Sequence, residues 1–196
     1  MRVPVCLYLS ANDAAPLELP RCRRALAHEP NRVRDPYLDD GAPPRRVVQL
    51  YFDSLAELEA AAASLAGRWR AEAMAVHAFA VPQPGAPRCT YLVAYEGPAE
   101  DEKAWQAHYL AHHPPIMARL PGIRELEVTL PLEWRCPPRL ERVRHMQRNK
   151  VAFDSADALE AALASPVRAE MRKDYARLPR FSGRVTHYAM TTYDCG

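Results

Sequence analysis

Phe52–Ser64 reads FDSLAELEAAAAS, and Phe153–Ser165 reads FDSADALEAALAS. The two stretches share the pattern FDSxxxLEAAxAS. In each, a serine follows an apolar run and precedes an Ala- and Leu-rich segment, which is typical of a helix N-cap. Ser54 and Glu57 also have the S-x-x-E spacing of a capping box. The sequence therefore predicts the same strand, cap and helix at two places in one chain.

Two shorter blocks repeat in the same order. Cys6–Leu9 (CLYL) matches Cys89–Leu92 (CTYL), and Leu26–Pro30 (LAHEP) matches Leu110–Pro114 (LAHHP). The separations of the three blocks are 83, 84 and 101 residues, so the second unit carries an insertion before its last block. This period is too long for a solenoid and indicates a tandem domain duplication.

The boundary between the units is expected in Pro82–Pro87 (PQPGAP), because proline and glycine favour turns. We expect a degenerate first unit over residues 1–83 and a better preserved second unit over residues 88–196.

The second unit shows the order β-α-β-β-α-β, which is the ferredoxin-like arrangement. The first unit is expected to have the same order in a shorter form. Each sheet has one face that its helices leave uncovered, and two such faces can bury each other. We therefore predict an α+β fold in which two ferredoxin-like repeats pack sheet to sheet as a barrel around an apolar cavity. The expected elements of the second unit are strands at 89–96, 123–134, 147–153 and 185–193, and helices at 100–112, 155–165 and 166–178.

Composition excludes several classes of protein. The net charge is +2 and the acids and bases are interspersed, which disfavours binding to nucleic acid or to an anionic membrane. No apolar run approaches the roughly 18 residues of a membrane span, and the first residues lack a secretory signal. The five cysteines form no C-x-x-C pair. We expect a cytoplasmic protein, and 23 arginines among 26 basic residues indicate a bacterial, GC-rich genome.

Histidines gather in 108–122, which reads HYLAHHPPIMARLPG. His108 and His112 are four residues apart, a spacing that allows two imidazoles to meet one ion. A third ligand is missing nearby, and Trp105 lies on the same helical stripe. No metal is predicted, and Trp105 and His108 are expected to line a ligand cavity or to pack on the sheet.

His112 and His113 lie at the expected end of this helix, where the helix dipole favours a protonated imidazole. A histidine that titrates near neutral pH can move a proton between two atoms of a ligand. The first unit has Glu29 where the second has His113, so His113 is the preferred candidate. The alternative is that these histidines pack on the sheet or satisfy terminal carbonyl groups.

The last strands of the two units carry His77 and His187. On a face that lines the cavity, they would meet Tyr91 or Tyr95 of the first strand. Alternation groups Val185 and Ala189 with His187 but leaves open which face is inward. Asp174 lies in the last helical stretch and is expected either to close over one end of the barrel or to be exposed.

The pattern W-x-x-H-Y-x-x-H-H-P-P-x-M-x-x-L-P-G, the FDS block and the terminal His-Tyr strand resemble the EthD-like branch of the dimeric α+β barrel proteins. The resemblance covers about residues 89–193 and implies a fused pseudo-dimer. It also implies that the His-Pro of this family corresponds to His113-Pro114. EthD-like proteins are associated with degradation of ethyl tert-butyl ether. Their relatives include muconolactone-type isomerases, monooxygenases without a cofactor, and polyketide cyclases or dehydratases.

Three functions remain open at this point. The leading one is a cofactor-independent isomerase, lyase or cyclase, or a cofactor-free oxygenase, that acts on a small hydrophobic or aromatic metabolite through His-mediated proton transfer. His113, His187, His112 and Tyr91 would be catalytic, and Tyr95, His108, Trp105, His77 and Asp174 would bind the ligand. The second is a non-catalytic binding or accessory protein of a catabolic pathway, and the third is an assembly partner with a filled barrel. No phosphate-binding glycine loop and no G-x-S-x-G motif is present. The protein is expected to be a monomer with an internal pseudo-dimer, or a homodimer.

Overall fold

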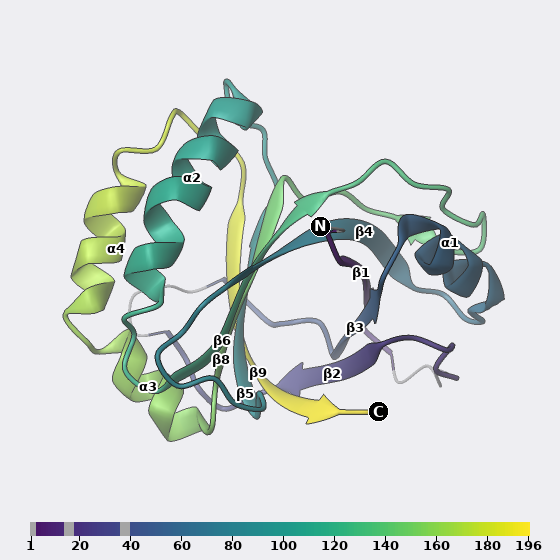
Figure 1. Cartoon of the computed structure of the whole chain (residues 1–196), viewed down its shortest axis with the longest axis horizontal. Coiled ribbons are helices and arrows are strands. Elements are labelled where there is room, and N and C mark those ends of the chain that lie inside the picture. The colour runs from purple at the N-terminus through teal and green to yellow at the C-terminus, as the bar shows by residue number, and fades with distance from the viewer. Residues whose placement is uncertain (1–2, 14–17, 36–39) are drawn as a thin grey trace.

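Eight strands close into one antiparallel barrel in the computed structural model, which describes residues 3–13, 18–35 and 40–196. Helices cover the outside of the barrel on two sides (Figure 1). The elements are β1 (Val5–Ala11), β2 (Arg24–Pro30), β3 (Arg46–Phe52), α1 (Leu55–Ser64), β4 (Arg70–Phe79), β5 (Cys89–Tyr95), α2 (Glu102–Met117), β6 (Ile123–Pro131), β7 (Glu141–Arg142), β8 (Gln147–Phe153), α3 (Ala156–Leu163), α4 (Val167–Tyr175) and β9 (Val185–Asp194).

The strand order around the barrel is β1-β3-β2-β9-β5-β8-β6-β4, and β4 pairs again with β1. Four neighbouring strands, β4-β1-β3-β2, come from the first half of the chain, and β6-β8-β5-β9 come from the second. The halves join where β2 pairs with β9 and where β4 pairs with β6. β7 adds a short parallel pairing at the start of β4. Pairing of all eight strands leaves no open edge in the barrel.

Helices α2 and α3 lie against the strands of the second half, and α4 packs on α2 and α3, whereas α1 lies against the first half (Figure 1). The repeated serines begin their helices as predicted. Ser54 Oγ accepts a hydrogen bond from the Glu57 amide, and Ser155 Oγ accepts one from the Ala158 amide. Asp101 caps α2 in the same way. These caps fix where the chain leaves each strand and therefore how the helices cross the sheet.

β5 is buried on both faces, because helices cover one side and the barrel encloses the other. Tyr91, Val93 and Tyr95 belong to the apolar core under the helices, and Leu92 belongs to a smaller cluster inside the barrel. Alternation of side chains along a strand produces this division. The helix side therefore holds the aromatic residues of the strand.

The inside of the barrel is filled by polar as well as apolar side chains. Lys150 is fully buried and contacts Glu127 at 2.9 Å and the Tyr51 hydroxyl at 2.6 Å. His28 is also fully buried, and its ring contacts Gln49 at 2.7 Å and Thr192 at 3.0 Å. The apolar cavity that we expected between the two sheets is therefore not found here, because hydrogen-bonded groups occupy the space.

We expected Leu26–Pro30 to be a degenerate copy of the helix end at Leu110–Pro114, and this prediction is wrong. The segment lies in β2, where Leu26 and His28 face the barrel and pair with β3 and β9. No helix occurs between β1 and β2 in the residues described there, which are 12–13 and 18–23. Four identical residues in a segment of five carry too little periodicity to separate a strand from a helix.

We also expected Pro114 to end or restart the first helix of the second half, with a short second turn after it, but α2 continues through Pro114 and Pro115 to Met117. Each proline lacks one donor of the helical ladder. The ladder resumes where the Ala118 amide donates to the Pro114 carbonyl at 2.8 Å. Because the helix ends soon afterwards, and Pro114 and Met117 are buried, packing offsets the lost hydrogen bonds.

Candidate functional site

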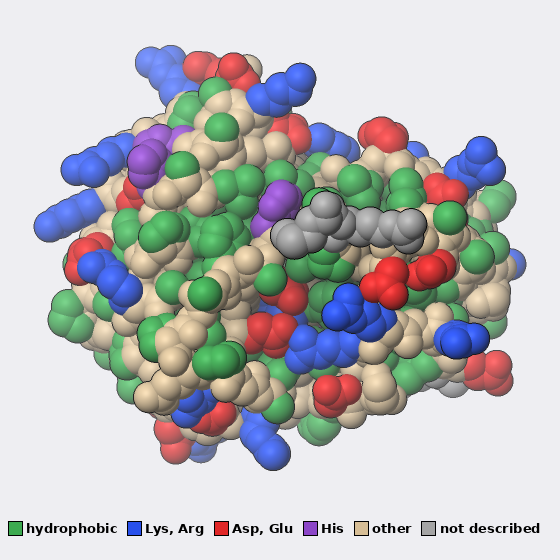
Figure 2. All heavy atoms as spheres, in the orientation of Figure 1, with side chains coloured by type: hydrophobic (Ala, Val, Ile, Leu, Met, Phe, Trp, Pro, Cys, Tyr) green, Lys and Arg blue, Asp and Glu red, His purple; other side chains and the backbone are tan. Residues whose placement is uncertain are grey.

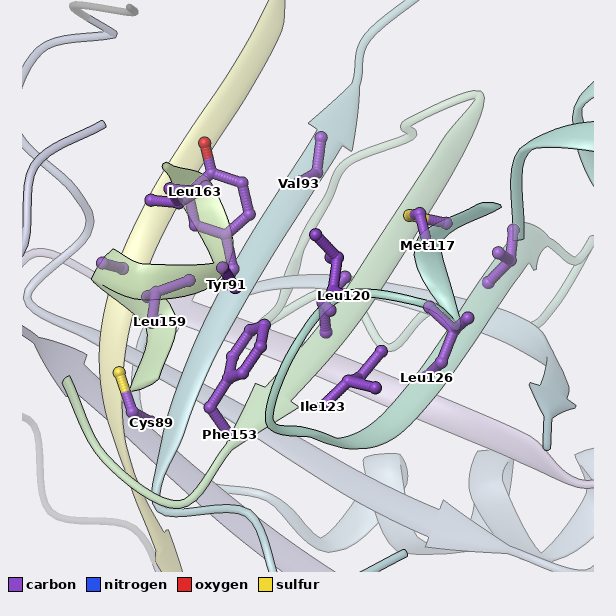
Figure 3. Close-up of a cluster of buried hydrophobic side chains, with 14 of the residues drawn as sticks. Cys89, Tyr91, Val93, Met117, Leu120, Ile123, Leu126, Phe153, Leu159 and Leu163 are labelled. Carbon is purple, nitrogen blue, oxygen red and sulfur yellow. The ribbon is translucent and has the colours of Figure 1, made fainter. Parts of the chain in front are cut away.

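A cavity of about 320 Å³ lies between the outer face of the second-half sheet and the helices α2, α3 and α4. Its walls are mainly apolar and aromatic. Figure 3 shows how Tyr91 and Val93 of β5 and Phe153 of β8 face Leu120 and Leu163 across this layer. Strand residues of alternate parity supply the floor, and helix residues supply the cover. The space is large enough for a small organic molecule, since an apolar cavity of about 150 Å³ can hold benzene.

His113 of α2 lines this cavity and pairs with Asp174 of α4. The distance from His113 Nδ1 to Asp174 Oδ2 is 2.8 Å, and both side chains are buried. Burial lowers the pKa of His113, and the hydrogen bond to Asp174 opposes that shift. A neutral imidazole beside a carboxylate carries its proton on Nδ1, so Nε2 keeps a lone pair.

His187 of β9 also lines the cavity, and Asp40 binds it in two ways. Asp40 Oδ2 lies 2.8 Å from His187 Nδ1 and accepts a hydrogen bond from the His187 amide at 2.8 Å. Burial lowers the pKa of His187, whereas the contact with Asp40 raises it. The second imidazole therefore has the same carboxylate partner at the same nitrogen as the first.

Tyr91 stacks in a tilted geometry beside His187, with the ring centroids 5.7 Å apart. Its hydroxyl donates a hydrogen bond to Asp35, and Arg168 of α4 binds the same carboxylate oxygen. Burial and the Asp35 carboxylate together raise the pKa of Tyr91. Tyr91 therefore keeps its proton and points it at Asp35, while its oxygen accepts a hydrogen bond from Arg168.

A third polar group lies on the sheet side of the cavity. Asn149 Nδ2 donates to the Tyr109 hydroxyl at 2.6 Å, and the Tyr95 hydroxyl lies 3.5 Å from the same oxygen. The side chain of Gln147 supports Asn149 at 3.1 Å. Burial raises the pKa of both tyrosines, so they act as neutral hydrogen-bonding groups.

The structure brings five of the nine predicted site residues together. His113, His187, Tyr91 and Tyr95 line the cavity, and Asp174 lies behind His113. The other four, Trp105, His108, His112 and His77, do not line it.

Trp105 is buried and packs on Tyr95 and Tyr109 at ring-centroid distances of 5.0 Å. His112 is exposed, and His77 lies on β4 opposite Val128. His108 is partly exposed, and its Nε2 is 3.6 Å from Asp174 Oδ1.

Our prediction of which histidines lie on the buried face of α2 was wrong. The buried face of the helix repeats every four residues at Trp105, Tyr109, His113 and Met117. We had grouped Trp105 with His108 and His112, because i+3 and i+7 are also on one side of an ideal helix. The sheet selects the i+4 series, and His113 is therefore buried while His112 points to solvent.

The grouping of Val185 and Ala189 with His187 is confirmed, but these residues face the helices and not the barrel interior. Met190 and Tyr188 lie on the barrel side instead. The cavity thus lies on the opposite face of the sheet from the one that we expected.

Three further groups at the site were missed in the sequence: Asp35, Asp40 and Arg168. The two aspartates come from the first half, in a Pro-rich and charged segment with no periodic pattern. Their partners are between 56 and 147 positions away, so only the fold brings them together. No local signal identified these residues.

Within residues 3–13, 18–35 and 40–196, no group of three or more histidine, cysteine or acidic side chains is arranged to hold a metal ion. In the same residues, no helix is long and apolar enough to cross a bilayer. Figure 2 shows acidic and basic side chains interspersed over one face of the molecule. On that face, no large patch of one charge marks a polyelectrolyte partner.

No protein-family model and no curated protein matches the sequence. Solved structures do resemble the fold. An anthrone oxidase-like protein is 15% identical at a TM-score of 0.58, and the match covers 100% of this chain and 94% of that one. A candidate monooxygenase from Lactobacillus acidophilus NCFM is 9% identical at a TM-score of 0.56, covering 97% and 94%.

A third neighbour is an EthD family protein from Bacillus halodurans C-125, which is 21% identical. It covers 50% of this chain and 96% of that chain at a TM-score of 0.40, so no argument rests on it. The two whole-chain neighbours show that this chain shares their α+β barrel fold.

Proposed function

We propose that the cavity under α2, α3 and α4 binds a small hydrophobic or aromatic metabolite and that His113 moves a proton within it. The observation that carries this proposal is the buried His113–Asp174 pair at 2.8 Å on the wall of an otherwise mainly apolar cavity. Binding sites of small molecules are typically apolar pockets with a few convergent polar groups. A paired imidazole in such a pocket is suited to general acid–base chemistry.

Proton transfer by this pair follows from its geometry. Nε2 of a neutral His113 removes a proton from an acidic carbon of the ligand, and Asp174 stabilises the imidazolium that forms. The imidazolium then returns the same proton to another atom of the ligand. The net reaction is an isomerisation, or an elimination or ring closure when a bond of the ligand breaks or forms at the same time. No cofactor is needed for these steps.

Replacement of each histidine tests the proposal. With a ligand identified as a substrate, His113→Ala and His187→Ala are each expected to lower kcat by about 10²-fold or more, the range of general acid–base catalysis. Activity of the unaltered protein should fall in acid, because a protonated imidazole is no base. His112→Ala is the matched control, since His112 is exposed on the other side of the same helix. Unchanged turnover in both variants would refute the mechanism, and a ligand that the unaltered protein binds without turning over would favour a binding protein.

A cofactor-free oxygenase is the second candidate. The whole-chain neighbours are named for oxidase and monooxygenase activities, and removal of an acidic proton by histidine would also begin such a reaction. Oxygen consumption during turnover distinguishes it from isomerisation.

We further propose that residues 1–83 and 88–196 are two ferredoxin-like repeats fused into one barrel. Support comes from the strand order, because β4-β1-β3-β2 and β9-β5-β8-β6 occupy corresponding places by order along each half. The fusion would let one chain form the contact that separate subunits otherwise supply. A monomer in solution is the expected outcome, and sedimentation analysis checks it.

A further inference from the structure

Three polar groups on the cavity wall direct their protons toward aspartates. His113 carries its proton on the nitrogen that faces Asp174, and His187 carries its proton on the nitrogen that faces Asp40. The Tyr91 hydroxyl donates to Asp35. Each of the three groups therefore donates a hydrogen bond to an aspartate.

The three aspartates fix the direction of these hydrogen bonds. A carboxylate can only accept, so the partner atom must donate. Each of these donors is committed in this way, and what remains is one lone pair on Nε2 of each imidazole, whereas the Tyr91 oxygen already accepts a hydrogen bond from Arg168. The two imidazoles thus present acceptors to whatever the cavity binds.

From this arrangement we infer that the ligand is a hydroxylated aromatic compound, which binds through its own O–H donors. The inference rests on the proposed function, since it concerns the same cavity. An O–H group gives His113 or His187 the donor that its Nε2 lacks, whereas an ether of the same shape leaves a buried acceptor without a partner. The aromatic frame follows from the walls, where Tyr91, Tyr95 and Tyr109 offer ring faces and edges.

The cavity volume sets the size of the frame. About 320 Å³ is roughly twice the space that holds one benzene ring, so a frame of two fused rings fits with its substituents. The Asp40 carboxylate, which lies on the same wall, would repel an anionic ligand. Arg168 and Arg172 also line the cavity and offset part of that repulsion. A carboxylated aromatic ligand is therefore the main alternative to a hydroxylated one, and a comparison of binding distinguishes the two.

Equilibrium dialysis of the whole protein against three naphthalene probes tests the inference. The probes are 2-naphthol, its methyl ether and 2-naphthoate, at neutral pH, where the naphthol is uncharged. We expect naphthol to bind about tenfold or more tightly than either other probe, since one buried hydrogen bond is worth about that factor. Equal binding of naphthol and the ether, or tightest binding of naphthoate, would overturn the inference and leave the proposed cavity function intact. If no probe binds, the inference of an aromatic ligand fails, whereas the proposed function, which also covers non-aromatic apolar ligands, is tested separately by the histidine variants.

Asparagine variants test the role of the positioning residues. Asp174→Asn and Asp40→Asn remove the enforced orientation of the imidazole proton, because an amide can donate as well as accept. We expect the preference for naphthol over the ether to fall in each variant and to be lost in the double variant. Glu170→Gln is the matched control, since Glu170 is an exposed acid on the same helix as Asp174. A preference that is unchanged in the double variant contradicts the inference.

Nitrogen-15 NMR of the imidazoles tests the same point without any substitution. In the unliganded protein at neutral pH, His113 and His187 are expected to show a protonated Nδ1 and an unprotonated Nε2. Addition of 2-naphthol should shift Nε2 of at least one of them. A proton on Nε2 of both residues would overturn the inference even if the asparagine variants fail to fold.

Discussion

Replacement of Lys150 by methionine is expected to destabilise the protein by about 3–5 kcal/mol, because it leaves buried carboxylates without their cation. The Lys150 ammonium lies 2.9 Å from Glu127 Oε2, 3.0 Å from Glu125 Oε1 and 2.6 Å from the Tyr51 hydroxyl. Its side chain is fully buried, so water cannot take its place. Glu125 keeps a second partner in Arg24 at 2.7 Å, whereas Glu127 keeps the neutral Tyr51 hydroxyl and, among the described residues, no second cation. Most of the lost stability therefore comes from the unpaired Glu127 carboxylate.

Chemical denaturation at neutral pH and at about pH 5 measures this effect. Burial and the neighbouring Glu125 already raise the pKa of Glu127, and loss of Lys150 raises it further. A carboxyl whose folded-state pKa lies above its unfolded value destabilises the fold at high pH and ceases to do so once it is protonated. The deficit of Lys150→Met should therefore shrink as the pH falls.

Two further variants make the result decisive. The double variant Lys150→Met with Glu127→Gln should recover most of the loss, since removal of both charges leaves no isolated ion. Arg23→Ala should change stability by less than about 0.5 kcal/mol, because its pair with Asp53 is exposed. A loss below about 1 kcal/mol for Lys150→Met, or no recovery in the double variant, would refute the argument.

Two other outcomes are expected from the structure. Gly183→Ala should destabilise the protein by about 2 kcal/mol or more in thermal unfolding, because an added Cβ would lie 2.0 Å from the Gly97 carbonyl oxygen, whereas Gly85→Ala, with its nearest atom at 3.4 Å, should be nearly neutral. Burial lowers the pKa of His28 to about 3, so stability should decline by up to about 1.4 kcal/mol per pH unit as the pH falls from about 6.5 toward 3, and His28→Gln should flatten that dependence; an unchanged slope would show that His28 is not the group responsible.

Much of the second half could be predicted from its own residues. The strands at β5, β8 and β9 and the cap at Ser155 follow from local pattern, and so do the cap at Ser54 and the loop at Pro82–Pro87 in the first half. The segment Leu26–Pro30 failed because a short match was given the conformation of its partner. Pairing with β3 and β9 makes this segment a strand, and the residues of the segment itself do not indicate that pairing.

The candidate site could also be predicted only in part, because the same short match was misinterpreted. His113 was selected by the difference between LAHHP and LAHEP, yet that alignment is wrong, and so the preference for His113 rested on an argument that the fold does not support. Its place on the cavity wall comes from the i+4 packing of α2 against the sheet. Its partner Asp174 was named as a site residue, but nothing in the sequence paired the two.

The sequence by itself determined the α+β class, most strands of the second half and the helix starts, because hydrophobic period and capping act over a few residues. Only the tertiary structure decided which face of the sheet holds the cavity and which acids stand behind His113, His187 and Tyr91. These contacts join residues 56 to 147 positions apart, and burial sets their protonation. Alternation assigns side chains to two faces of a strand, but it cannot say which face the helices will cover.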